Sequence, residues 1–197
     1  MSFWDTIFEI INSVAGRNDI LDNIMLFSSQ KLPIIFALVV VLLYVVGIIT
    51  KNRKAREVAV NTVIFTFLNM ILSFILGHIF YAPRPFVKDK GATLLYPHEA
   101  NSSFPSDHSL ASMSIALGLN KYSKILGTIM IILSVLMGIS RVYVGHHYPQ
   151  HVLGSYVIAV ITSYLYNKYL STKFRNLYFN IEKRTPILKG LVKKKHR

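Results

Sequence analysis

Five long apolar runs, separated by short polar stretches, dominate the pattern of hydrophobic and polar positions along this chain. The runs cover residues 32–50, 58–83, 108–120, 125–140 and 152–166. The first of them has no charged residue over 19 positions, and as a helix it would extend roughly 28 Å, close to the thickness of a bilayer core. We therefore predict an all-α, polytopic membrane bundle whose spans are these five runs.

The N-terminal region has a different pattern. Residues 3–15 place apolar side chains on one helical face, residues 16–19 break the helix, and residues 20–27 resume it. Five charges fall in this stretch, so it is either an interfacial helix or a partly shielded first span. The bundle then has about six helices. The expected organisation is an N-terminal helix at 1–30, a membrane domain at 31–170, and a basic tail at 171–197.

Charge is segregated along the chain. There are 22 basic and 9 acidic residues, and most of the basic ones lie in three clusters, at 51–56, 121–124 and 168–197. This is the placement of topology signals, and it argues against nucleic-acid binding. If the clusters are cytoplasmic, the segments at 81–107 and 142–151 both face outward. The same rule puts the N-terminus inside if residues 3–27 cross the membrane, and outside if they do not. Cysteine is absent, which excludes disulfides and thiolate metal sites.

Polar residues suited to phosphate binding occur in three segments, each at an end of an apolar run: residues 81–85, 104–108 and 140–149. In the second segment, Ser106 or Asp107 is the expected N-cap of a helix, and free backbone N–H groups at a helix start bind anions. Taken alone, this segment is also typical of an ordinary helix start with a solvated histidine. The other two segments favour the anion site.

Arginine and histidine side chains strengthen the phosphate interpretation. Arg141 lies near the end of an apolar run, where a charge is costly unless it meets an anion. Arg84 lies between two prolines on a stiff turn, and a guanidinium fork binds two phosphate oxygens at once. His147 follows Arg141, and Pro149 suits the first turn of the last helix. Two arginines and two helix starts are thus expected on one side of the membrane.

A metal site at the clustered histidines is the alternative. His147 and His151 are four residues apart, a spacing that can place two rings on one helical face. Pro149 intervenes, however, no acidic ligand has a suitable spacing, and the arginines would repel a cation. We therefore predict no metal and no other cofactor.

These segments resemble the three signatures of the type 2 phosphatidic acid phosphatase superfamily, most closely its bacterial undecaprenyl-diphosphatase branch of the bacitracin-resistance (BcrC) type. The matching residues, in order, are Arg84-Pro85, Pro105-Ser106-Asp107-His108, and Ser140-Arg141 with His147. The resemblance covers about residues 20–170. It implies a six-helix membrane bundle, a metal-independent mechanism and an external active site.

The resemblance also implies roles. His147 would be the nucleophile that forms a phosphohistidine, and His108 would be the general acid that later activates water. The groups expected to hold the phosphoryl oxygens are Arg84, Arg141, Ser106 and the backbone around Asp107.

Two positions depart from the family pattern. The family usually has a lysine seven residues before the first arginine, where this chain has Gly77, and Lys88 or Lys90 are the candidates to replace it. The family aspartate four residues after the nucleophile is His151 here.

The second departure bears on turnover. The aspartate holds the nucleophile's imidazole in one tautomer, and replacing the comparable carboxylate of a serine protease by its amide costs about 10⁴ in kcat. A neutral His151 could accept the His147 N–H instead, and Asp107 and Glu99 are further candidates. We count His151 among the catalytic residues, predict lower turnover than with aspartate, and expect His151→Asp to raise phosphate release.

The sequence therefore predicts an integral membrane enzyme of the bacterial plasma membrane, with its active site outward and its C-terminus cytoplasmic. It would hydrolyse an isoprenoid diphosphate lipid, undecaprenyl diphosphate, to undecaprenyl phosphate and phosphate, and so recycle the cell-wall lipid carrier. The expected partners are this substrate and membrane lipids. Two alternatives stay open: a phosphatase of phosphatidylglycerophosphate or phosphatidic acid, and a catalytically weakened lipid head-group binder or transporter.

Overall fold

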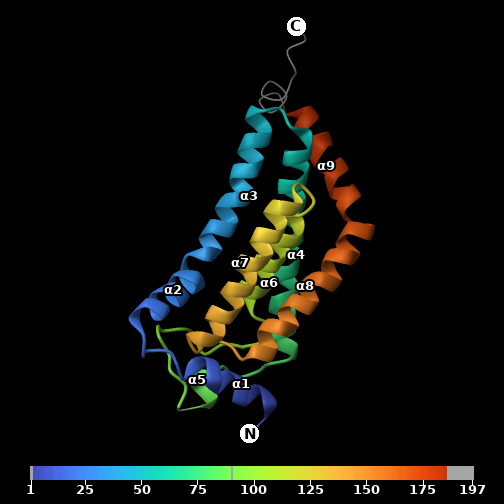
Figure 1. The fold of residues 1–197 in the computed structure, drawn as a ribbon. Helices are drawn as coiled ribbons and strands as arrows, with labels where there is room; N and C mark the ends of the chain where they lie inside the picture. Colours follow the sequence, from blue (N-terminus) through green and yellow to red (C-terminus); the bar gives the residue numbers. More distant parts are fainter. Residues whose placement is uncertain (1, 90, 186–197) are drawn as a thin grey trace.

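The computed structural model of the chain describes residues 2–89 and 91–185, and this part is an all-helical bundle without strands (Figure 1). Its helices are α1 (Phe3–Asn12), α2 (Asp19–Gln30), α3 (Leu32–Ile49), α4 (Arg53–Ile79), α5 (Pro85–Lys88), α6 (Asp107–Leu119), α7 (Lys124–Tyr143), α8 (Pro149–Tyr169) and α9 (Ser171–Arg184). The predicted all-α fold is confirmed, and the five predicted spans correspond to α3, α4, α6, α7 and α8. Lys90 and residues 186–197 of the predicted tail lie outside the described residues.

Local sequence accounts for where the helices begin. Ser2 and Asp5 cap α1 reciprocally, and the Asn18 side chain accepts from Leu21 N–H at the start of α2. The predicted break at residues 16–19 thus separates α1 from α2. Pro149 occupies the first turn of α8, as predicted, where its missing N–H has no helical partner to lose.

Three helices of the described part, α3, α4 and α7, are long and apolar enough to cross a membrane. Large apolar side chains are exposed on the outer faces of the bundle, where they would contact lipid chains. They include Leu42, Phe67, Ile132 and Val157. Helices with such exposed apolar faces are stable in lipid rather than in water, so the chain is a membrane protein.

Helix α6 lies in the middle of the bundle, where it contacts α3, α4, α7 and α8. It has 13 residues, and small side chains let its neighbours approach closely. A Cβ added to Gly118 would lie 2.4 Å from Thr62 Oγ1 of α4. Hydroxyl pairs join the helices, as between Ser112 and Ser134 at 2.7 Å. This packing fixes the start of α6, which carries one of the predicted motifs.

The two ends of the bundle differ in character. The end of α9 lies at one end, close to the connection between α3 and α4, whereas α1, α5 and the N-terminus lie at the other (Figure 1). At the first end Arg56 is buried and donates to both carboxylate oxygens of Glu182, at 3.1 and 3.2 Å, which ties α9 to α4. At the second end Asn12 donates to Thr93 O and to Tyr143 O, both at 2.8 Å. Helix α1 thereby fastens the long α5–α6 connection to the end of α7.

Candidate active site

The first and third predicted segments meet at the Arg84 side chain, at the end of the bundle where the N-terminus lies. Its Nη1 donates to His146 O at 3.0 Å and to His147 Nε2 at 3.1 Å. Its Nε and Nη2 both donate to Asn101 Oδ1, at 3.0 and 2.6 Å. Arg84 is only 4% exposed, although it belongs to the connection between two helices. The first and third segments are thus in direct contact, through residues that lie 62 and 63 positions apart in the chain.

A tight turn between α7 and α8 presents the two neighbouring histidines. Gly145 has φ +85°, a left-handed conformation that favours glycine, and a Cβ there would lie 2.4 Å from Thr93 O. His146 N and His147 N both donate to Arg141 O, at 3.1 and 3.2 Å. Both imidazoles are buried, and the turn holds them over the end of α7.

The partners of His147 select its tautomer. Nδ1 lies 2.8 Å from Ser103 O, and a carbonyl oxygen only accepts, so Nδ1 carries the proton. Nε2 lies 3.1 Å from Arg84 Nη1, which only donates, so Nε2 has its lone pair free of a proton. The two contacts agree independently. An imidazole held in this way has the electronic form of a nucleophile at Nε2.

Burial, helped by neighbouring positive charges, keeps His146 and His147 neutral. Burial lowers the pKa of His147 well below its usual value, and the positive charges of Arg141 and Arg84 lower that pKa further. Burial also lowers the pKa of His146 to about 3, and Arg141 contributes there too. Burial, with Arg141 as the next cause, lowers the pKa of Arg84 to about 10, which leaves it charged at neutral pH. The site is therefore a pocket of positive charge around neutral imidazoles.

Arg141 projects from the last turn of α7 and is 1% exposed. Its Nη1 donates to Ser29 Oγ at 2.9 Å and to Tyr96 Oη at 2.6 Å. Its Nε and Nη2 are buried without a hydrogen-bond partner among the described residues. Unsatisfied guanidinium donors of this kind are costly in a protein interior, and an oxyanion would satisfy them.

The second segment supplies the start of α6. Ser106 is its N-cap, and Ser106 N donates to Ser155 Oγ of α8 at 2.8 Å. The Ser106 hydroxyl pairs with Ser109 Oγ at 3.0 Å rather than capping the helix. The first backbone N–H groups of α6 have no partner within the helix, as in any α-helix. Asp107 is exposed and accepts a hydrogen bond from Ser73 Oγ of α4.

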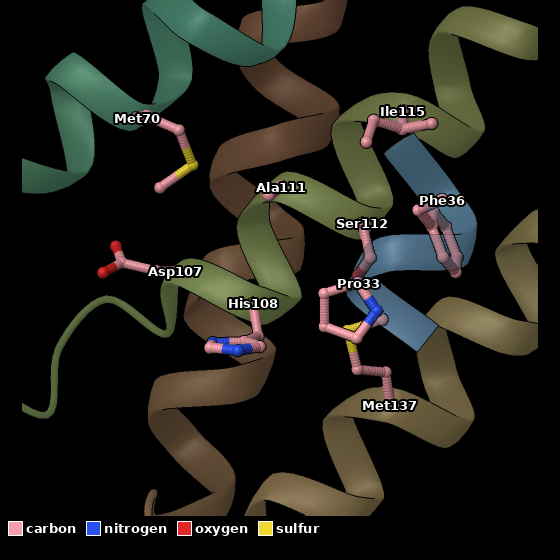
Figure 2. A pocket seen from close by; sticks show the side chains of 9 residues that line it. All are labelled: Pro33, Phe36, Met70, Asp107, His108, Ala111, Ser112, Ile115 and Met137. Atoms are coloured by element: carbon pink, nitrogen blue, oxygen red, sulfur yellow. The ribbon is translucent and has the colours of Figure 1, made fainter. Parts of the chain in front are cut away.

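His108 stands beside an apolar pocket of about 210 Å³ between α3, α4, α6 and α7 (Figure 2). Phe36, Met70 and Met137 contribute to its walls, and Asp107 lies at its edge. A positive charge on His108 also lowers the pKa of His147, so the two imidazoles interact electrostatically. A histidine side chain and an apolar cavity therefore lie next to each other at the start of α6.

Lys88 and His151, the predicted replacements for the family lysine and aspartate, contact residues other than His147. Lys88 Nζ lies 5.7 Å from the centre of the Tyr148 ring, in a surface hollow lined by acidic residues of α1. Gly77 packs against the 102–104 segment, where a Cβ would lie 3.4 Å from Phe104 O. His151 Nδ1 lies 2.8 Å from Ser103 Oγ, so the hydroxyl of Ser103 stands between it and His147.

Four contacting residues were not among the predicted site residues: Ser29, Tyr96, Asn101 and Ser103. Three of them lie in the long connection before α6, and the fourth lies at the end of α2. They act through a hydroxyl, an amide or a backbone carbonyl, groups that occur throughout any chain. For Tyr96, Asn101 and Ser103, the position shortly before the second segment was the available signal in the sequence.

Acid should destabilise the folded chain. The unfolded chain takes up protons on His146 and His147 below about pH 6.5, whereas the folded chain keeps both neutral, so the free energy of unfolding decreases as pH falls. The expected slope is at most about 1.4 kcal/mol per pH unit for each histidine. The measurement is the thermal midpoint of the protein in detergent between pH 7.5 and 4.5. This temperature should decrease as the pH is lowered beyond 6.5, and it should decrease less steeply for His146→Phe. A midpoint that is constant or rises over this range contradicts the neutral assignment.

Comparison with known proteins identifies the family of this chain. The family model of the PAP2 superfamily matches residues 58–175. "Undecaprenyl-diphosphatase BcrC" of Bacillus subtilis (strain 168) is 32% identical over 83% of this chain and 82% of its own length. "Putative undecaprenyl-diphosphatase YbjG" of Escherichia coli (strain K12) is 28% identical over 79% and 77%.

A solved structure shows the same fold. The crystal structure of Aquifex aeolicus LpxE superposes with a TM-score of 0.69 at 23% identity, covering 86% of this chain and 97% of that one. The fold, the family match over more than half of the chain and the relatives of similar length agree with one another. The chain therefore belongs to the PAP2 superfamily, as a membrane-embedded lipid phosphatase.

Proposed function

We propose that this chain hydrolyses undecaprenyl diphosphate to undecaprenyl phosphate and inorganic phosphate through a phosphohistidine at His147. The observation that carries the proposal is the tautomer of this residue. Ser103 O fixes the proton on Nδ1, and the lone pair of Nε2 points at Arg84, a phosphate-binding side chain. An incoming phosphoryl group would take over the Arg84 donor and meet Nε2 at the same place.

The first step transfers the phosphoryl group to the protein. The Nε2 lone pair of His147 attacks the terminal phosphorus and forms a P–N bond, while the bond from phosphorus to the bridging oxygen breaks. His108 gives its proton to the departing oxygen, so the lipid leaves as a monophosphate. Placed between anionic phosphates, the imidazole of His108 would favour its protonated form.

The second step restores the protein. His108, now neutral, takes a proton from a water molecule whose oxygen attacks phosphorus, and the P–N bond breaks with its electrons returning to Nε2 of His147. The products are inorganic phosphate and the original histidine. The net change is the addition of one water across the diphosphate bond.

Positive charge and oriented donors stabilise the charge that develops on the phosphoryl oxygens. The unsatisfied Nε and Nη2 of Arg141 and the Nη1 and Nη2 of Arg84 are the candidate N–H donors to these oxygens. The start of α6, next to Ser106, adds backbone N–H groups. No metal is needed for this arrangement, since guanidinium groups provide the charge that a cation provides elsewhere.

The apolar pocket beside His108 supports a lipid substrate rather than a soluble one. Its lining side chains are mainly apolar. The relatives named above as undecaprenyl-diphosphatases favour an isoprenoid diphosphate as that lipid. A prenyl chain in the pocket would place the head group at His108.

The charge clusters favour an outward active site in the bacterial plasma membrane. The cluster at 51–56 lies at the α3–α4 connection and the first turn of α4. The cluster at 121–124 lies at the α6–α7 connection and the start of α7, and both clusters lie away from the Arg84 end. If these clusters are cytoplasmic, the site, the N-terminus and α1 face outward, and the end of α9 faces inward. Helix α1 is then interfacial rather than a span.

The test is phosphate release by the purified protein in detergent. We expect undecaprenyl diphosphate to be hydrolysed with a kcat/KM at least tenfold above those of phosphatidylglycerophosphate and phosphatidic acid. A preference for either glycerolipid would assign a different substrate. Binding of undecaprenyl diphosphate without any release of phosphate would make the chain a head-group binder instead.

A further inference from the structure

Ser103 contacts two histidines: His147 of the third segment and His151, which follows that segment. It is fully buried, and its backbone N–H donates to Ala82 O at 2.7 Å, which fixes the carbonyl in place. Its carbonyl oxygen lies 2.8 Å from His147 Nδ1. Its hydroxyl oxygen lies 3.4 Å from the same Nδ1 and 2.8 Å from His151 Nδ1. One residue outside the three family signatures thus joins positions 147 and 151.

The proton on each of these groups follows from what its partner can do. His147 Nδ1 is protonated because Ser103 O only accepts. For the Ser103 hydroxyl oxygen to accept from the same N–H, its own proton must point elsewhere, and His151 Nδ1 is the acceptor at 2.8 Å. The order of donation is then His147 to Ser103 to His151.

The His151 ring is held in the orientation that this order requires. It makes edge contacts with Phe104, at 5.7 Å between ring centres, and with Tyr148, at 5.6 Å. The main chain of His151 adds a further restraint, because its carbonyl accepts from Ser155 Oγ at 2.8 Å. A ring packed on two sides presents Nδ1 to Ser103 with little freedom to turn away.

We propose that Ser103 is the positioning residue of the nucleophile and that His151 acts on His147 through the Ser103 hydroxyl, in the place where a carboxylate would otherwise stand. The inference rests on the proposed function, in which His147 attacks phosphorus. During attack the His147 ring gains positive charge, and its N–H hydrogen bond strengthens. A neutral serine–histidine pair orients the ring as a carboxylate does, but it does not offset that charge. The pair should therefore affect kcat and leave KM nearly unchanged.

The experiment is a double-mutant cycle on undecaprenyl diphosphate hydrolysis. Ser103→Ala keeps the carbonyl and removes the hydroxyl, so kcat should fall roughly tenfold to a hundredfold, the range for second-layer positioning groups, with KM within about twofold. His151→Ala should cause a similar fall. The double variant should be no slower than the slower single variant, because both changes break one connection. Ser28→Ala, which removes another buried hydroxyl, one that donates to Ile24 O of its own helix, should keep normal activity.

His151→Asp supplies the second arm. A carboxylate would accept from the Ser103 hydroxyl and also offset the charge on His147, so kcat should rise, by about tenfold or less because the tautomer is already set by Ser103 O. In the Ser103→Ala background this gain should disappear. If Ser103→Ala does not fold, opposite changes of kcat in His151→Asp and His151→Ala carry the test on their own.

The proposal is overturned if Ser103→Ala stays within twofold of the parent protein, or if the losses of the two single variants multiply in the double variant. Equal effects of His151→Asp and His151→Ala would overturn it as well. These results differ from a failure of the proposed function, in which the parent protein itself releases no phosphate from undecaprenyl diphosphate. In that case the inference falls with it.

Discussion

Replacing His147 with alanine should reduce phosphate release from undecaprenyl diphosphate by at least roughly 10⁴-fold. The loss is this large because the covalent route has no second nucleophile to use, and removing a nucleophile removes both of its steps. Substrate should still bind, because Arg84 and Arg141 stay in place. The measurement is kcat in detergent, together with the Kd for the lipid.

His78→Ala is the matched control for that variant. His78 is an exposed histidine on the last turn of α4, and its Nδ1 pairs with Phe74 O at 2.8 Å. It should retain activity within twofold of the parent protein. A His147→Ala protein that folds and keeps more than about a tenth of the parent activity would exclude the covalent mechanism.

Replacing His108 with glutamine should lower kcat by about 10² to 10⁴-fold, the usual contribution of a general acid. Glutamine keeps a hydrogen-bonding side chain but cannot deliver a proton. The loss should depend on the leaving group. It should be large for phenyl phosphate, since phenolic groups like that of tyrosine have a pKa near 10, and much smaller for 4-nitrophenyl phosphate, whose leaving group needs no proton.

The comparison of the two aryl esters separates acid catalysis from a structural role. A glutamine that merely disturbed the start of α6 would slow both esters equally. An equal loss on the two substrates would therefore remove His108 from the proton-transfer step.

The arrangement of the membrane helices could be predicted from the sequence because it depends on uncharged length. The runs at 32–50 and 125–140 have no charge over a bilayer thickness, and α3 and α7 follow them closely. Helix α6 is different: its serines and alanines face other helices, and at 13 residues it is too short to be recognised by length. Only packing against its neighbours gives it its central place.

The convergence of Arg84 and His147 could also be predicted, because basic clusters place both segments on one side of the membrane. The hydrogen bonds made by His147 and Arg141 could not be predicted from the sequence. The proton on His147 is fixed by a backbone carbonyl at position 103, and every residue has a carbonyl. The support of Arg141 by Ser29 and Tyr96 likewise joins parts of the chain 112 and 45 positions away, which only the folded chain brings together.

The position of His151 shows why the family pattern alone misleads here. Sequence reasoning expected a direct contact with His147 or a substitute carboxylate. Asp107 instead accepts from Ser73, and Glu99 accepts from the Asn101 amide at 3.4 Å. His147 instead contacts Ser103, so under the proposed mechanism the absence of the aspartate would cost charge compensation rather than orientation.

The phosphohistidine itself is the most direct test of the mechanism. The parent protein would be mixed with undecaprenyl diphosphate labelled with ³²P in its terminal phosphate, quenched in base within milliseconds to seconds, and digested for mass spectrometry. A phosphohistidine mechanism predicts acid-labile, base-stable label on the peptide that carries His147, and none in His147→Ala. Phosphate release at the normal rate with no label on that peptide, or with label on another residue, would contradict it.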